Sequence, residues 1–165
     1  MARVARVLGT SVAAVFLLNP SVRELRECVG RELATEADQV AATQELIQLG
    51  GARVVVVSLG GQGALLVTAQ AIQRIPAVTM RSGSGSGARD AMVAAITVGL
   101  SRGWPLSKSV CFGVAAEAAM LMMPGTATCN RDDVERLFRT RRRPGGPRCT
   151  AQLGKRTCAM TDARR

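Results

Sequence analysis

A glycine-rich segment that ends in an aspartate is the part of this sequence best suited to phosphate chemistry. Residues 83–90 read Gly-Ser-Gly-Ser-Gly-Ala-Arg-Asp and lead into the apolar stretch 92–98. Glycines allow several backbone N–H groups to point at one place, and the start of a helix adds unpaired donors and a positive dipole end. Asp90 would lie beside an anion bound there, where a carboxylate can take a proton from an attacking hydroxyl. The same composition is also typical of a flexible connector ending in a helix cap.

A second glycine cluster follows a run of four valines, and the two clusters together resemble a known pair of motifs. Residues 57–64 read Val-Ser-Leu-Gly-Gly-Gln-Gly-Ala, and residues 87–94 read Gly-Ala-Arg-Asp-Ala-Met-Val-Ala. Both resemble motifs of the ribokinase/PfkB family of carbohydrate kinases, in particular its 6-phosphofructokinase-like branch, and the similarity extends from about residue 19 to 138. The resemblance implies phosphoryl transfer from magnesium-bound ATP to a sugar phosphate such as fructose 6-phosphate.

The resemblance also implies roles for individual residues, each with a structural alternative. Asp90 would be the catalytic base, and the alternative is a helix-capping carboxylate. The backbone amides of Gly87, Ala88 and Arg89 would form an anion hole. The positions implied to contact the nucleotide are Ser58, Gly60, Gly63, Gly113 and Ala116. Their alternatives are a tight turn for the first three and close helix packing for the last two. No metal ligand is predicted within the chain, because the five cysteines show no Cys-x-x-Cys spacing and histidine is absent.

Three positions depart from the family pattern. Arg89 stands where the family has glycine. Its side chain is expected either to forbid the required backbone angle or to fill the space of the transferred phosphoryl group. The alternative is that it lends the phosphoryl group a positive charge. Glu117 stands where the family has a small residue. Its side chain is expected either to point to solvent or to obstruct the adenine pocket. Residues 19–21, Asn-Pro-Ser, replace a Lys-Pro-Asn sequence, and Ser21 is expected to cap a helix instead.

Periodicity and turn residues predict alternating strands and helices. Buried strands are predicted at 12–18 and 54–57, with an antiparallel meander formed by 64–68 and 72–76 near the sheet edge. Ser21, Thr35 and Asn130 are expected to cap helices. Val40, Ala41, Leu46 and Ile47 are expected to point inward from the second of these helices. Further helices are predicted from residue 90 to Gly103 and over 107–123.

The predicted fold class is α/β and ribokinase-like, with a partly parallel sheet flanked by helices. The predicted organisation is a short extension over 1–11, an ATP-binding half-domain over 12–138, and a basic, disordered tail over 139–165. By this resemblance, the family's sugar-binding half and lid are expected to have no counterpart before residue 12. We therefore expect a truncated kinase, aggregation-prone or homo-oligomeric through its exposed edges. The alternative function is a non-catalytic fragment that keeps weak nucleotide or protein binding.

The net charge of +10 resides mostly in the tail, where basic residues outnumber acidic ones by eight from Arg139 onward. Because the tail has no interleaved aromatic residues, a nucleic-acid partner is not expected. The apolar stretch 7–18 is too short to span a membrane and lacks a small-residue cleavage pattern, so it predicts a strand instead of an export signal. The scattered, odd number of cysteines favours reduced thiols and a cytoplasmic location.

Overall fold

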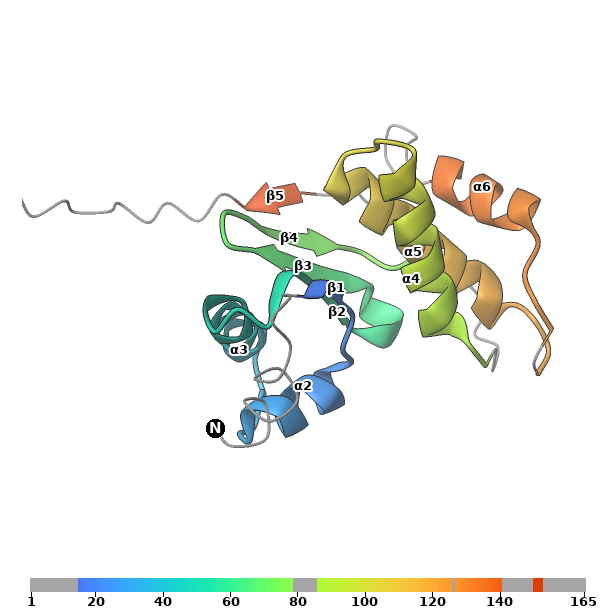
Figure 1. The fold of residues 1–165 in the computed structure, drawn as a ribbon. Coiled ribbons are helices and arrows are strands. Elements are labelled where there is room, and N and C mark those ends of the chain that lie inside the picture. The colour runs from blue at the N-terminus through green and yellow to red at the C-terminus, as the bar shows by residue number, and fades with distance from the viewer. Residues whose placement is uncertain (1–14, 79–85, 126, 141–149, 153–165) are drawn as a thin grey trace, which may run out of the picture.

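A computed structural model describes residues 15–78, 86–125, 127–140 and 150–152, and its strands form one mixed sheet (Figure 1). The strand order is β1-β2-β3-β4-β5. β1 and β2 are parallel, whereas the pairs from β2 to β5 are antiparallel. The strands are β1 (Val15–Leu18), β2 (Ala52–Ser58), β3 (Ala64–Thr68), β4 (Ile72–Ile75) and β5 (Thr150–Gln152). The partly parallel sheet and its meander are confirmed.

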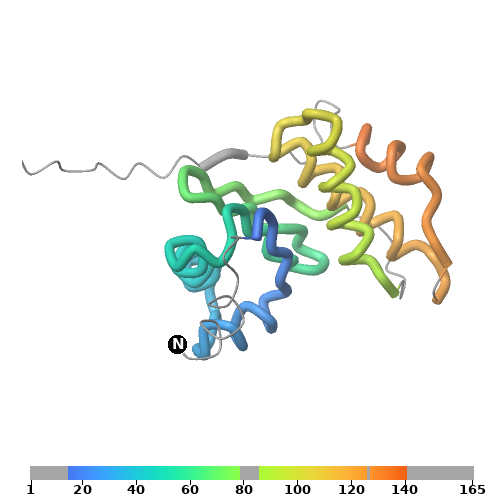
Figure 2. The backbone as a smooth tube through the Cα atoms, in the orientation of Figure 1, coloured from blue at the N-terminus to red at the C-terminus, as the bar shows by residue number. Residues whose placement is uncertain are grey.

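Helices cover both faces of this sheet, as the tube in Figure 2 also shows. α2 (Val22–Val29) and α3 (Glu36–Gln48) pack on one face, and α4 (Ala88–Ser101) and α5 (Leu106–Leu121) pack on the other. α6 (Arg131–Thr140) packs against the outer side of α5. A short 3-10 turn, η1 (Gly60–Gln62), connects β2 to β3. The layered α/β arrangement predicted from the sequence is thereby confirmed.

The four valines of β2 explain why helices are needed on both sides. Val55 and Val57 belong to the core shared with α2 and α3, whereas Val54 and Val56 belong to the core shared with α4 and α5. All four are nearly inaccessible to solvent. Successive side chains of a strand point to opposite faces, so an uninterrupted apolar run requires apolar cover on both.

β1 is less buried than its sequence suggested. The predicted strand 12–18 is observed as Val15–Leu18, and residues 12–14 lie outside the described part of the chain. Val15 and Phe16 are 41% and 52% exposed. Within the described residues β1 pairs with β2 alone, which makes it an edge strand. The prediction of a buried strand was therefore wrong for its first half.

Two further expectations are corrected. Ala41 was expected to point inward but is exposed, and Ala42 and Thr43 are buried instead; Val40, Leu46 and Ile47 pack toward the sheet as predicted. The tail was expected to be disordered from residue 139, but α6 continues to Thr140, and 150–152 pair with β4. The remaining residues of the tail lie outside the described chain.

Ser21 forms a complete capping box with Glu24 at the start of α2. Replacing Ser21 with alanine is expected to lower the free energy of unfolding by about 1 kcal/mol, because a helix-start N–H loses its acceptor. Urea denaturation of the variant and the parent measures the difference. Ser101→Ala is a matched control, since that hydroxyl is exposed in the last turn of α4 and donates to the Val98 carbonyl oxygen. Equal stability of both variants would contradict the capping role.

Candidate active site

The carboxyl end of β1 meets α2 and the start of α4 around one cavity. Ligands of open α/β sheets commonly bind outside the carboxyl ends of the strands. The cavity has a volume of about 630 Å³. Its lining residues on the β1–α2 side are Leu18, Asn19, Pro20, Glu24 and Cys28, and those on the α4 side are Gly87, Ala88, Arg89, Asp90 and Val93. The glycine-loop residues singled out in the sequence therefore face the beginning of α2.

Polar contacts fix the strand ends behind this cavity. The Ser58 backbone N–H donates to the Pro20 carbonyl oxygen at 2.9 Å. The Asn19 side-chain amide donates to the Val56 carbonyl oxygen at 2.9 Å, and the Ser58 hydroxyl donates to Asn19 Oδ1 at 3.3 Å. Ser58 is only 7% exposed and does not line the cavity. Its hydroxyl thus links β2 to β1, and its contact with a nucleotide stays a prediction.

The first turn of α4 has the features expected of an anion site. Gly87, at the N-cap, has φ +82°, a left-handed conformation that favours glycine, and no side chain in the described part of the chain caps the helix. The first N–H groups of a helix have no partner within it, so those of α4 remain available to an anion. The glycines at 83 and 85 lie outside the described residues.

Asp90 lies in this first turn with an exposed side chain that lines the cavity. The carboxylate lies in the same turn as Gly87, Ala88 and Arg89, whose amides stay predicted as an anion hole. It also places a negative charge at the positive end of the α4 dipole, where it stabilises the helix. Both interpretations of Asp90 therefore fit its place in the fold, and its role as a base stays a prediction.

Arg89 adopts an ordinary helical backbone, since no residue other than glycine has a positive φ in the described chain. Whether the family's glycine needs a different backbone angle at this position stays a prediction. Its guanidinium Nη1 donates to Glu24 Oε2, which links α4 to α2 across the cavity. The Glu24 carboxylate also accepts from the backbone N–H and the hydroxyl of Ser21 at 2.7 and 2.8 Å. These contacts, the Ser21 backbone donor first and the Arg89 donor second, lower the pKa of Glu24 to about 2.

Glu117 is buried, so the alternative in which it points to solvent was wrong. Its side chain belongs to the part of α5 that packs beneath the start of α4, and the residue is 8% exposed. Burial raises the pKa of Glu117 to about 7, and the nearby positive charge of Arg89 opposes that rise. No hydrogen bond joins the carboxylate to another described residue. Near neutral pH this side chain therefore exists as a mixture of its neutral and charged forms.

The other residues predicted to contact a nucleotide do not line the cavity. A Cβ on Gly113 would lie 2.6 Å from Ile96 Cγ1, so this glycine permits the close approach of α5 to α4. Ala116 is buried in the cluster formed by α5 and α6. Gly60 is exposed in η1 with φ +57°, and Gly63 is buried in the turn that follows. Packing and turn geometry account for these positions, and their nucleotide contacts stay predictions.

The sequence predicted a helix cap at Ser21 but not the place of its partner Glu24 at the cavity. The Ser-x-x-Glu spacing indicates the cap and gives no sign that the carboxylate also meets α4. Within the described chain, no group of three or more Cys, Asp or Glu side chains is arranged to hold a metal ion. Nor does any helix there have the length and apolar character needed to cross a membrane.

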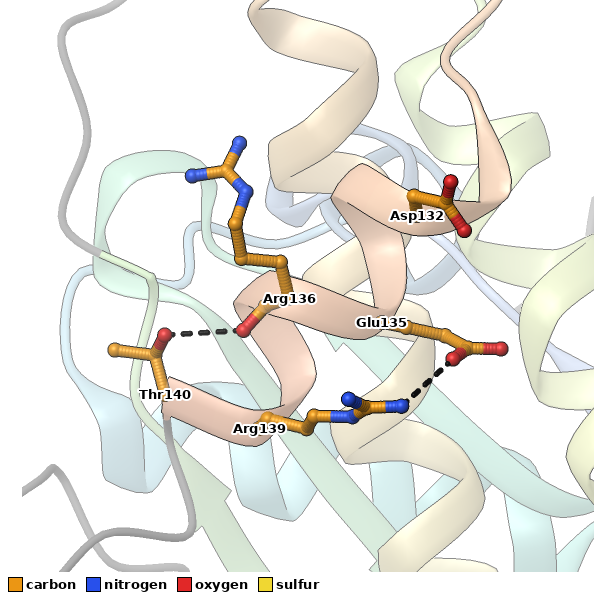
Figure 3. A pocket seen from close by; sticks show the side chains of 5 residues that line it. All are labelled: Asp132, Glu135, Arg136, Arg139 and Thr140. Carbon is orange, nitrogen blue, oxygen red and sulfur yellow. Dashed lines mark hydrogen bonds and ion pairs between the residues drawn. The ribbon is translucent and has the colours of Figure 1, made fainter.

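A second hollow, of about 500 Å³, lies along α6 and contains none of the candidate residues (Figure 3). Three of its charged side chains pair along the helix itself: Arg139 Nη2 donates to Glu135 Oε2 at 3.1 Å, and Arg136 Nη2 donates to Asp133 Oδ1 at 2.7 Å. The Thr140 hydroxyl donates to the Arg136 carbonyl oxygen. This surface is an exposed set of ion pairs on a single helix, which contributes little to binding or stability.

Comparison with known proteins assigns the chain to a family. The profile of the pfkB family of carbohydrate kinases matches residues 3–133, and the chain belongs to that family. Over 126 residues it is 68% identical to the ATP-dependent 6-phosphofructokinase isozyme 2 of Mycobacterium tuberculosis, covering 76% of this chain and 37% of that protein. The chain therefore spans little more than a third of the length of that relative.

Solved structures agree with this assignment. The crystal structure of phosphofructokinase-2 from Escherichia coli in complex with potassium superposes with a TM-score of 0.73 at 38% identity, over 78% of this chain and 41% of that chain. Ribokinase from Thermotoga maritima superposes with a TM-score of 0.66 at 26% identity, over 74% and 42% of the two chains. The ribokinase-like fold predicted from the glycine motifs is thereby confirmed.

Proposed function

We propose that the cavity between α2 and α4 is the nucleotide-phosphate site of an ATP-dependent carbohydrate kinase that acts on a sugar phosphate. The observation that carries the proposal is the shared position of Asp90 and the uncapped first turn of α4, both on one cavity at the carboxyl end of β1. Membership of the pfkB family and the similarity to 6-phosphofructokinases support phosphoryl transfer as the reaction.

Each part of the site has a distinct task in such a reaction. The first N–H groups of α4 would hold the oxygens of the transferred phosphoryl group and stabilise the charge that develops on them. The Asp90 carboxylate would accept the proton of the attacking sugar hydroxyl. Magnesium, when bound, neutralises charge on the ATP phosphates. It would arrive with the nucleotide, because the described residues offer no metal-binding cluster of their own.

The acceptor sugar is a separate part of the proposal. The similarity covers 37% of the M. tuberculosis relative, and no described residue other than Asp90 is assigned a contact with the sugar. The second candidate function is therefore nucleotide binding without transfer. The charged form of the buried Glu117 carboxylate would weaken phosphate binding at the α4 start in either function.

Two measurements separate these functions. Calorimetric titration with ATP and magnesium tests binding, and a coupled assay with fructose 6-phosphate tests transfer. Asp90→Asn is expected to lower kcat by about 100-fold or more while ATP binding is retained, because the variant loses a base that acts only in the reaction. Asp132→Asn is a matched control, since Asp132 is an exposed first-turn residue of α6.

The possible outcomes distinguish the two candidate functions. Binding without turnover would support the second function, and absence of ATP binding would contradict both. Turnover by Asp90→Asn would contradict the role of Asp90 as the base, but it would not contradict the nucleotide site.

A further inference from the structure

Arg89 is the one cationic side chain among the described residues that line the cavity. The other ionisable groups there are the carboxylates of Glu24 and Asp90 and the thiol of Cys28. A polyphosphate carries several negative charges, and the two carboxylates alone would repel it. The residue that departs from the glycine of the family motif therefore supplies the positive charge that the lining otherwise lacks.

The contact with Glu24 holds the Arg89 guanidinium in place and leaves several of its N–H donors unoccupied. It donates to Glu24 through Nη1, and no further hydrogen bond occupies Nε or Nη2 within the described chain. An arginine side chain has five N–H donors in a planar fork, so several donors remain after one carboxylate contact. The side chain is 48% exposed, so a ligand that enters the cavity can reach these donors.

Glu24 is well suited to fixing that orientation. The Ser21 backbone N–H and hydroxyl hold its carboxylate in the first turn of α2, and its lowered pKa keeps it charged throughout the neutral range. α2 and α4 lie on opposite faces of the sheet, so the Glu24–Arg89 ion pair spans the cavity between the two layers. A ligand at the α4 amides would thus meet a pre-oriented guanidinium beside them.

We infer that Arg89 is a phosphate-binding side chain of this cavity and that Glu24 is the positioning residue that holds its guanidinium beside the α4 amides. The ligand class is a polyphosphate, either free pyrophosphate or the phosphate chain of a nucleotide. The inference rests on the proposed function for the identity of the site, but phosphate contact by Arg89 does not require that transfer takes place.

Binding of inorganic pyrophosphate to the full chain, measured by calorimetry at two salt concentrations, tests this inference. Arg89→Ala is expected to weaken binding about tenfold or more and to flatten the salt dependence, because a charge-assisted contact is lost. Arg89→Lys should give intermediate affinity, since it keeps the charge and loses the fork. Arg26→Ala is the matched control, because Arg26 pairs with Glu32 on the exposed side of α2 and does not line the cavity.

The positioning role of Glu24 needs a double-mutant cycle. Glu24→Gln should weaken pyrophosphate binding when Arg89 is present and should have a smaller effect in the Arg89→Ala background, because Glu24 acts through Arg89. Equal effects in both backgrounds would overturn the positioning role. Thermal unfolding of each variant shows that the fold is retained.

Unchanged pyrophosphate binding by Arg89→Ala would overturn the phosphate contact, and tighter binding would in addition show that the side chain obstructs the cavity. Failure of the parent chain to bind pyrophosphate would overturn it as well. Pyrophosphate binding that depends on Arg89, in a chain that transfers no phosphoryl group to fructose 6-phosphate, would refute the proposed kinase reaction and leave this inference standing.

Discussion

Replacing Gly63 with alanine is expected to lower the free energy of unfolding by about 3 kcal/mol or more, because the new Cβ has no space and the backbone is strained. Gly63 has φ +95°, a region that residues with side chains rarely adopt. A Cβ there would lie 2.1 Å from the Ile75 carbonyl oxygen and 2.5 Å from the Ala77 nitrogen. Both are backbone atoms, one at the end of β4 and one just beyond it, so relief requires movement of the backbone there.

Chemical denaturation of Gly63→Ala beside Gly61→Ala measures this effect. Gly61 lies two residues away in η1, its φ is not positive, and a Cβ there would meet nothing within 4 Å. The control is therefore expected to change stability by less than about 0.5 kcal/mol. A loss of similar size in both variants would show that the turn tolerates neither side chain for some reason other than the close approach of β4. If Gly63→Ala were as stable as the parent, the tight turn would not explain this glycine.

The parts of the fold that the sequence predicted well depend on local chemistry. The capping residues Ser21 and Thr35 each precede an acidic partner by three positions, and both boxes are present at the expected helix starts. The four valines of β2 required apolar cover on both faces and have it. Such signals come from a few neighbouring residues, so they do not depend on how the rest of the chain packs.

The parts that escaped prediction depend on residues far apart in the sequence. Arg89 and Glu24 are separated by 65 positions, and nothing local to either residue indicates their ion pair. The exposure of Val15 and Phe16 depends on which strand lies beside β1, a property of the whole sheet. The burial of Glu117 likewise depends on how α5 packs under α4. The candidate site was thus predictable as a glycine motif with Asp90, whereas its α2 side was not.

The buried Glu117 carboxylate should make the stability of this protein fall as the pH rises from about 4.5 toward 7. The pKa of an ordinary glutamate, 4.5, is raised by burial to about 7 in the folded chain. The folded state therefore binds this proton more tightly than the unfolded state. Its contribution is fully present below pH 4.5 and is lost progressively as the pH rises, and above pH 7 the loss levels off at about 3 kcal/mol.

Glu117→Gln removes this titration and keeps the size of the side chain. At pH 8 the variant is expected to be more stable than the parent by about 3 kcal/mol, because it need not bury a charge, and near pH 4.5 the two should be nearly equal. Urea denaturation between pH 4.5 and 8 measures the difference. Glu27→Gln on the exposed side of α2 is the matched control and should shift stability little at any of these pH values. A difference between Glu117→Gln and the parent that stays constant across this range would show that Glu117 does not titrate there. A parent that becomes more stable from pH 4.5 to 7, with the same rise in Glu117→Gln, would place the pH dependence on other groups.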